Sequence, residues 1–152
     1  GQKCPSPRFA LRRHQNLLFY ALTNRGKMKF AKYTFLIAGI YGLLALIPQY
    51  FLENKIGTDA PPAITHPEFY YGFIGVAVAF QLVFLVISRD PQQYRMLIIP
   101  SIVEKFSFAI PAAILFATGH LNSQMFAAGM LDAVLGLLFI VSWFKVPAAD
   151  EL

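Results

Sequence analysis

Ionisable side chains within long apolar stretches are the residues of this sequence that could perform chemistry. Glu104 and Lys105 are adjacent in the otherwise apolar run of residues 101–111, and Asp132 lies in a second apolar run. A charge at the centre of a bilayer costs about 2.5–3.5 kcal/mol on insertion scales, so a charge kept there is a functional candidate. A buried carboxyl group can bind a ligand or a proton, or it can join helices by hydrogen bonds.

Four long apolar stretches carry these residues. Of the 152 residues, 57% are hydrophobic and 14% are charged, whereas soluble domains have about 25% charged residues. A helix crosses the ~30 Å hydrocarbon core with about 20 apolar residues. The stretches lie at about residues 33–52, 70–88, 97–118 and 124–144. We therefore expect an all-α integral membrane protein, with a four-helix bundle formed by a single membrane domain, residues 28–152.

The distribution of Lys and Arg predicts the orientation of this bundle. Basic residues gather before the first span, in the second connection at Arg89 and Arg95, and after the last span at Lys145. The connections on the other side contain Lys55 alone. Because cytoplasmic connections carry the excess of positive charge, we expect both termini to be cytoplasmic.

Residues 1–27 differ from the rest of the chain, because they are basic and precede Met28, a plausible start for a small membrane protein. Two interpretations remain open. The segment is an upstream or disordered extension, or it is a basic arm that contacts anionic lipid. Nucleic-acid binding is not expected, and the single Cys4 allows no internal disulfide.

Polar side chains of three spans fall in one layer of the membrane. Counted from the nearest span end, Glu104 and Gln81 lie ~10 Å deep and Tyr41 ~12 Å deep. Ser101 and Ser107 flank Glu104 at a spacing of three residues, which places them on its helix face. We expect Gln81 and Tyr41 to donate hydrogen bonds to Glu104. The carboxyl group then either joins helices as a neutral acid or binds a proton or a ligand.

Lys105 and Asp132 are not expected to form an ion pair. Adjacent helical residues point about 100° apart, so Glu104 and Lys105 are not a facing pair either. Side chains lean toward the N-terminus of their helix, which directs Lys105 toward the cytoplasmic headgroups, where its ammonium would snorkel. Asp132, ~20 Å from the cytoplasmic side, leans the other way. Near the small residues Gly129 and Ala133, it forms a bond between helices or a counter-charge to a ligand.

The longest connection between spans, residues 53–68, is expected to be a loop because it contains Gly57 and the pair Pro61–Pro62. Pro67 suits a first helical turn, so the neighbouring His66 and Glu68 belong to a helix start or to a metal or proton site outside the membrane. Too few ligands at a fixed spacing are present to predict a metal site. No cofactor is expected.

The chain resembles the DoxX-like group of small bacterial membrane proteins. The shared features are four short spans, two cytoplasmic termini and acidic residues in the later spans. The stretch HPEFYYGFIGVAVAFQLVFLVISRDPQQYRMLIIPSIVEKFSF is similar to stretches of uncharacterised bacterial proteins of this size. The resemblance implies a bacterial inner membrane and, for some members, quinone-linked redox partners. This sequence lacks the CxxC motif or paired His that would hold a haem or an iron–sulfur cluster.

The sequence thus predicts a multi-pass membrane protein that binds a hydrophobic or lipid-like molecule, or a membrane partner, within its helix bundle. Two alternatives stay open: a proton-coupled transporter that uses a buried carboxyl group, and a lipid-modifying membrane enzyme. We expect no catalytic residue. The bilayer is the expected partner, together with a hydrophobic small molecule or a quinone-linked protein, and a homodimer is compatible with the transporter.

Overall fold

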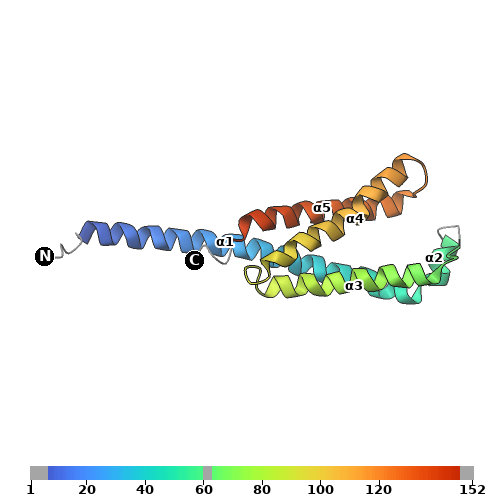
Figure 1. The fold of residues 1–152 in the computed structure, drawn as a ribbon, viewed down its shortest axis with the longest axis horizontal. Helices are drawn as coiled ribbons and strands as arrows, with labels where there is room; N and C mark the ends of the chain where they lie inside the picture. Colours follow the sequence, from blue (N-terminus) through green and yellow to red (C-terminus); the bar gives the residue numbers. More distant parts are fainter. Residues whose placement is uncertain (1–6, 60–62, 148–152) are drawn as a thin grey trace.

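Every element of the structure is a helix in the part of the chain that it describes. The computed structural model describes residues 7–59 and 63–147, with side chains from residue 26 onward. Figure 1 shows the arrangement. In chain order the elements are α1 (Pro7–Leu46), the 3₁₀ turn η1 (Ile47–Phe51), α2 (Glu53–Asp59), α3 (Pro67–Arg89), the 3₁₀ turn η2 (Arg95–Leu97), α4 (Ile98–Ala117) and α5 (Ser123–Lys145).

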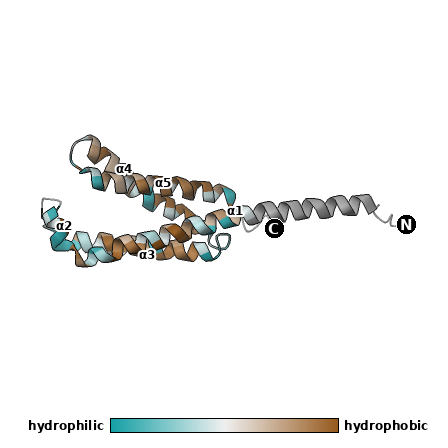
Figure 2. Ribbon diagram, turned by 180° about the vertical axis from the view of Figure 1, so that it is seen from behind, coloured by the Kyte–Doolittle hydropathy of each residue, from teal (hydrophilic) through white to brown (hydrophobic). Residues whose placement is uncertain are grey.

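Four segments are long and apolar enough to cross a membrane, as the sequence predicted. They are Gly26–Phe51, Pro67–Arg89, Arg95–Ala117 and Ser123–Lys145. Figure 2 shows their apolar character along each ribbon. Helix α1 begins at Pro7 and so extends beyond the first of these segments. Cys4 lies outside the described residues.

The long helices form two antiparallel pairs, α1 with α3 and α4 with α5 (Figure 1). Glycine allows close approach in each pair. A Cβ added to Gly42 of α1 would overlap the Gln81 side chain of α3. A Cβ added to Gly129 of α5 would lie 2.6 Å from the Cβ of Ala112 in α4. The small residues therefore bring the backbones together, as they do in other membrane helix pairs.

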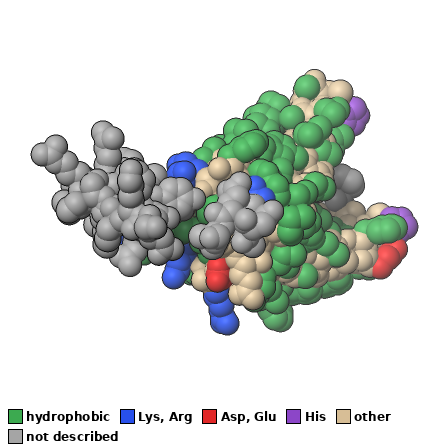
Figure 3. All heavy atoms as spheres, turned by 60° about the vertical axis from the view of Figure 1, so that its left-hand side comes forward, with side chains coloured by type: hydrophobic (Ala, Val, Ile, Leu, Met, Phe, Trp, Pro, Cys, Tyr) green, Lys and Arg blue, Asp and Glu red, His purple; other side chains and the backbone are tan. Residues whose placement is uncertain are grey.

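The two pairs meet at one end of the molecule, which we call the basic end because it carries Lys29, Arg89 and Lys145. Figure 3 shows Lys and Arg side chains toward one end of the described part of the chain, and histidines toward the opposite end. We call the opposite end, with α2 and the turn between α4 and α5, the turn end. The pairs diverge toward the turn end in both ribbon views (Figures 1 and 2).

Three fully buried phenylalanines join the pairs at the basic end. Phe35 of α1 stacks on Phe139 of α5 with ring centroids 4.2 Å apart. Phe84 of α3 meets Phe139 edge-on at 4.9 Å. Aromatic pairs at such separations contribute about 0.5–1.5 kcal/mol beyond the area that they bury. This Phe cluster therefore connects three of the four long helices.

The connection of residues 53–68 contains a helix that the sequence did not predict. Residues Glu53–Asp59 form α2, in which Lys55 Nζ lies 2.6 Å from Asp59 Oδ2 at the i, i+4 spacing. The Thr58 hydroxyl donates to the Asn54 carbonyl at 2.7 Å. Gly57 is accommodated within this short helix, and residues 63–66, the other described part of the connection before α3, are not helical.

Arg95 ties the start of the α4 segment to the end of α5. Its Nε donates to the Val146 carbonyl at 2.9 Å and its Nη2 to the Trp143 carbonyl at 3.3 Å. Its guanidinium carbon lies 3.7 Å from the centroid of the Trp143 ring. One planar cation thus satisfies carbonyls at a helix C-terminus and stacks on an aromatic face.

We expect Arg95→Lys to lower the free energy of unfolding by about 1–3 kcal/mol, because an ammonium cannot reproduce two directed hydrogen bonds and a stacked face. Reversible unfolding in mixed micelles would measure the change. Arg89→Lys is the matched control, since Arg89 is exposed at the same end. Equal stability of the two variants would contradict the role given to Arg95.

Candidate functional site

Lys105 is buried between three helices, although it carries a charge. The residue is 4% exposed. Its Nζ lies 3.0 Å from Asp132 Oδ1 of α5 and 3.3 Å from Glu104 Oε2 of its own helix. The same ammonium lies 5.2 Å from the centroid of the Phe84 ring in α3, within the range of a cation–π contact. We call Glu104, Lys105 and Asp132 the charge cluster.

The expectation that Lys105 and Asp132 would not pair was wrong. The expectation rested on the opposite directions in which the two side chains lean toward the N-termini of their helices. Counted from the turn that joins α4 and α5, Lys105 lies 12 residues before Ala117 and Asp132 lies 9 residues after Ser123. The two positions then differ by only ~5 Å in height. A lysine side chain spans that distance.

The predicted snorkelling of Lys105 was also wrong. An ammonium in a membrane takes the site with the best partners, and here a carboxylate of the neighbouring helix lies 3.0 Å from it. The angle of about 100° between adjacent helical residues does not prevent contact with Glu104 either. Both side chains are flexible enough to reach the same point from different faces of α4.

Glu104 is the less well paired of the two carboxyl groups. Its Oε1 accepts a long hydrogen bond of 3.4 Å from Lys105 Nζ, whereas Asp132 accepts one of 3.0 Å. Oε2 is enclosed and has no hydrogen-bond donor among the described residues, although it lies 3.3 Å from the same ammonium. With both carboxyl groups ionised, the charge cluster has two negative charges and one positive charge.

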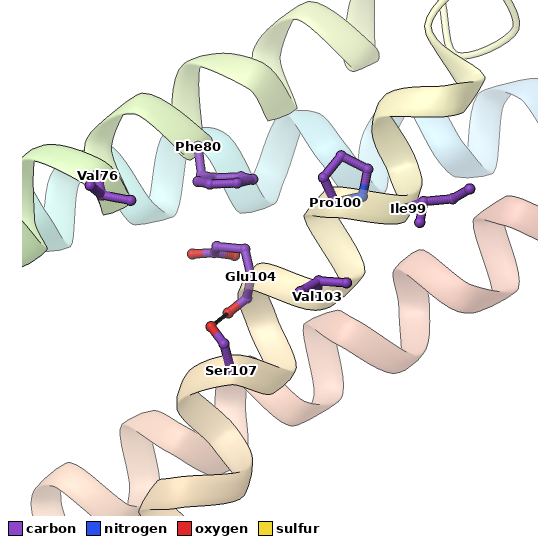
Figure 4. Close-up of a pocket in the computed structure, with 7 residues that line it drawn as sticks. All are labelled: Val76, Phe80, Ile99, Pro100, Val103, Glu104 and Ser107. Atoms are coloured by element: carbon purple, nitrogen blue, oxygen red, sulfur yellow. Dashed lines mark hydrogen bonds between the residues drawn. The ribbon is translucent and has the colours of Figure 1, made fainter.

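Glu104 also lines a groove between α3 and α4. The groove has a volume of about 460 Å³, and Val76 and Phe80 of α3 form one wall. The other wall belongs to α4, where Glu104 and Ser107 are the polar members; Ile99, Pro100 and Val103 complete it. In Figure 4 the Glu104 carboxyl group points into the space between the helices, opposite Phe80. The Ser107 hydroxyl donates to the Glu104 carbonyl at 2.7 Å, so it supports the backbone of this wall.

Gln81 and Tyr41 do not donate hydrogen bonds to Glu104. Gln81 is fully buried between α3 and α1, where its Nε2 donates to the Ala77 carbonyl at 3.0 Å. Tyr41 lies on the exposed surface of α1. Ser101 is buried and donates to the Leu97 carbonyl at 2.7 Å. Similar depth placed these residues in one layer, but the rotation of each helix turns them to different interfaces.

His66 and Glu68 contact each other at the turn end. Nδ1 of His66 lies 3.1 Å from Oε1 of Glu68, and both side chains are exposed. His66 immediately precedes α3, and Pro67 is its first residue. Across the described ranges, no group of three or more His, Cys, Asp or Glu residues could hold a metal ion. The pair lies at the start of α3.

Phe80 and Phe84 complete the site, and the sequence analysis did not single them out. Phe80 lines the groove. The Phe84 ring makes the cation–π contact with the Lys105 ammonium. The signal was their i, i+4 spacing, which places the two rings on one side of α3. In a sequence with 15 phenylalanines, that spacing does not distinguish a site from ordinary packing.

Comparison with known proteins yields no relative for this chain. No protein family, no curated protein and no solved structure matches it. The resemblance to the DoxX-like group therefore stays a prediction.

We expect Lys105→Met to reduce the free energy of unfolding by about 3–5 kcal/mol, because it leaves buried carboxylates without their counter-charge. Adding Glu104→Gln and Asp132→Asn to the same chain should restore most of the loss, since no unpaired charge remains. Reversible unfolding in mixed micelles would measure both variants. Lys29→Met, at an exposed site, is the control. If Lys105→Met were as mild as Lys29→Met, the ammonium would not be holding the helices together.

Proposed function

We propose that this protein binds a hydrophobic or lipid-like molecule in the groove between α3 and α4. The observation that carries the proposal is a largely apolar groove of about 460 Å³ with a partly buried carboxyl group in one wall. Small-molecule sites have this composition, in which apolar side chains provide contact area and a few polar groups fix orientation. No chemical step is required of the site.

The position of the groove supports entry from the bilayer. Val76 and Val103 lie on its two walls, and both are more than half exposed. In a helix that crosses a membrane, such valines face acyl chains. A lipid-like molecule can therefore slide between α3 and α4 without passing through water.

We also propose that both termini face the cytoplasm, in a bacterial inner membrane. The gathering of Lys and Arg at the basic end supports this orientation. The resemblance to DoxX-like proteins, some of which have suggested quinone-linked partners, supports the choice of membrane. A quinone is one hydrophobic molecule of suitable class.

The groove can be tested with a long-chain alcohol that carries a photoreactive diazirine, added to the protein in nanodiscs of zwitterionic lipid. Crosslinks would be located by peptide mass spectrometry. We expect labelling of Val76, Phe80 and Val103 to exceed labelling of Val134 and Leu137, which are exposed apolar residues of α5. This ratio within one molecule cancels the partitioning of the probe into the bilayer.

Val103→Phe should lower the ratio several-fold by filling the groove. Val134→Phe makes the same substitution on the exposed surface of α5 and should leave groove labelling unchanged. Uniform labelling of all exposed apolar residues in the wild-type protein would refute the proposed function, because the groove would then be ordinary lipid-facing surface.

The orientation can be tested in a Cys4→Ser background with one cysteine introduced at His120 or at Gln93. Both residues are exposed in turns, at the turn end and at the basic end respectively. A membrane-impermeant maleimide added to intact cells should label the His120→Cys variant and leave the Gln93→Cys variant unlabelled until the membrane is opened. The reverse pattern would invert the proposed orientation.

A further inference from the structure

With both of its carboxyl groups ionised, the charge cluster has one more negative than positive charge at the groove, which bears on the polar end of a ligand. We propose that the groove selects an amphiphile with a single cationic ammonium head, whose charge pairs with Glu104 while its apolar part lies along α3 and α4. This inference rests on the proposed function, because it assumes that the groove is occupied.

The first step is the charge balance inside the protein. Lys105 is shared by two carboxyl groups, and it lies closer to Asp132, at 3.0 Å, than to Glu104, at 3.3 Å. One ammonium cannot neutralise two carboxylates, so the second carboxyl group must either take up a proton or bear an uncompensated negative charge. In a low-dielectric interior such a charge is costly unless a counter-charge binds. A monocationic ligand supplies that counter-charge, whereas a neutral or anionic one does not.

The second step concerns which carboxyl group the ligand meets. Glu104 lines the groove, whereas Lys105 and Asp132 are not among the groove-lining residues. Glu104 Oε2 is enclosed but accepts no hydrogen bond from the described residues. A small shift of this side chain toward the groove would present an unused acceptor to a ligand's N–H group, while Lys105 keeps Asp132 as its partner.

The third step concerns the wall of the groove opposite Glu104. The Phe80 ring of α3 faces Glu104 across the groove (Figure 4). An aromatic ring attracts a cation to its face, and the attraction strengthens when water is excluded. A carboxylate on one wall and a ring on the other form a suitable site for an ammonium. Beyond it, Ile99, Pro100 and Val103 provide an apolar surface that extends ~6 Å along α4 from residue 99 to residue 103.

The test uses three diazirine probes that have the same alkyl chain and differ only in their heads: an amine, an alcohol and a carboxylic acid. Each is added to the protein in nanodiscs of zwitterionic lipid at pH 7. The readout is labelling of Val76, Phe80 and Val103 relative to Val134 and Leu137. We expect this ratio to be about tenfold higher for the amine than for the alcohol, as a charge-assisted hydrogen bond allows, and lowest for the acid.

Two substitutions separate charge balance from shape. Glu104→Gln removes the negative charge but keeps an acceptor oxygen, and it makes the cluster neutral, so the preference for the amine should disappear. Asp132→Asn leaves Glu104 in place but gives it Lys105 as sole partner, and the preference should disappear there too. Labelling by the alcohol should persist in both variants, which shows that the groove is intact. Glu68→Gln, an exposed carboxyl at the turn end, is the control and should retain the preference.

The outcomes distinguish this inference from the proposed function. Equal groove labelling by the amine and the alcohol in the wild-type protein would overturn the proposal of a cationic ligand. The groove would then remain a site for lipid-like molecules without selection for charge. A preference for the acid would overturn it as well. If none of the probes favours the groove over α5, the proposed function fails and the inference fails with it. The wild-type comparison of the three heads decides the matter even if a variant does not fold.

Discussion

One ammonium group, that of Lys105, holds the site together. It pairs with Asp132 of α5, contacts Glu104 of its own helix and lies over the Phe84 ring of α3. Burying a charge in a membrane is costly, so the ammonium holds partners from neighbouring helices at fixed distances. Glu104 is consequently kept at the groove wall and does not swing out toward lipid or headgroups.

The remaining structure follows from where the helices pack and where they do not. The Phe cluster of Phe35, Phe84 and Phe139 joins three helices, and Arg95 closes the basic end by binding the last carbonyls of α5. Toward the turn end the two helix pairs diverge (Figure 1). The groove between α3 and α4 is a consequence of this uneven packing, with the charge cluster beside it.

Gln81 and Glu104, which the sequence placed in one layer of the membrane, have different roles in the structure. Gln81 lies against Gly42 at the contact of α1 with α3, so its amide belongs to a helix interface. Glu104 lies in the wall of the groove between α3 and α4. The first residue stabilises a pair of helices, and the second is available to a ligand.

The sequence by itself determined the helical class, the four membrane segments and the unusual position of Glu104, Lys105 and Asp132, because hydropathy and length are local properties. It did not determine α2, the Lys105–Asp132 pair or the partners of Gln81 and Tyr41. Those depend on the relative height and rotation of helices, which a difference of a few residues in the α4–α5 turn changes by several ångströms. Only the tertiary structure decided that Glu104 faces α3 across a groove. The groove exists because the two helix pairs meet at the basic end and diverge from there.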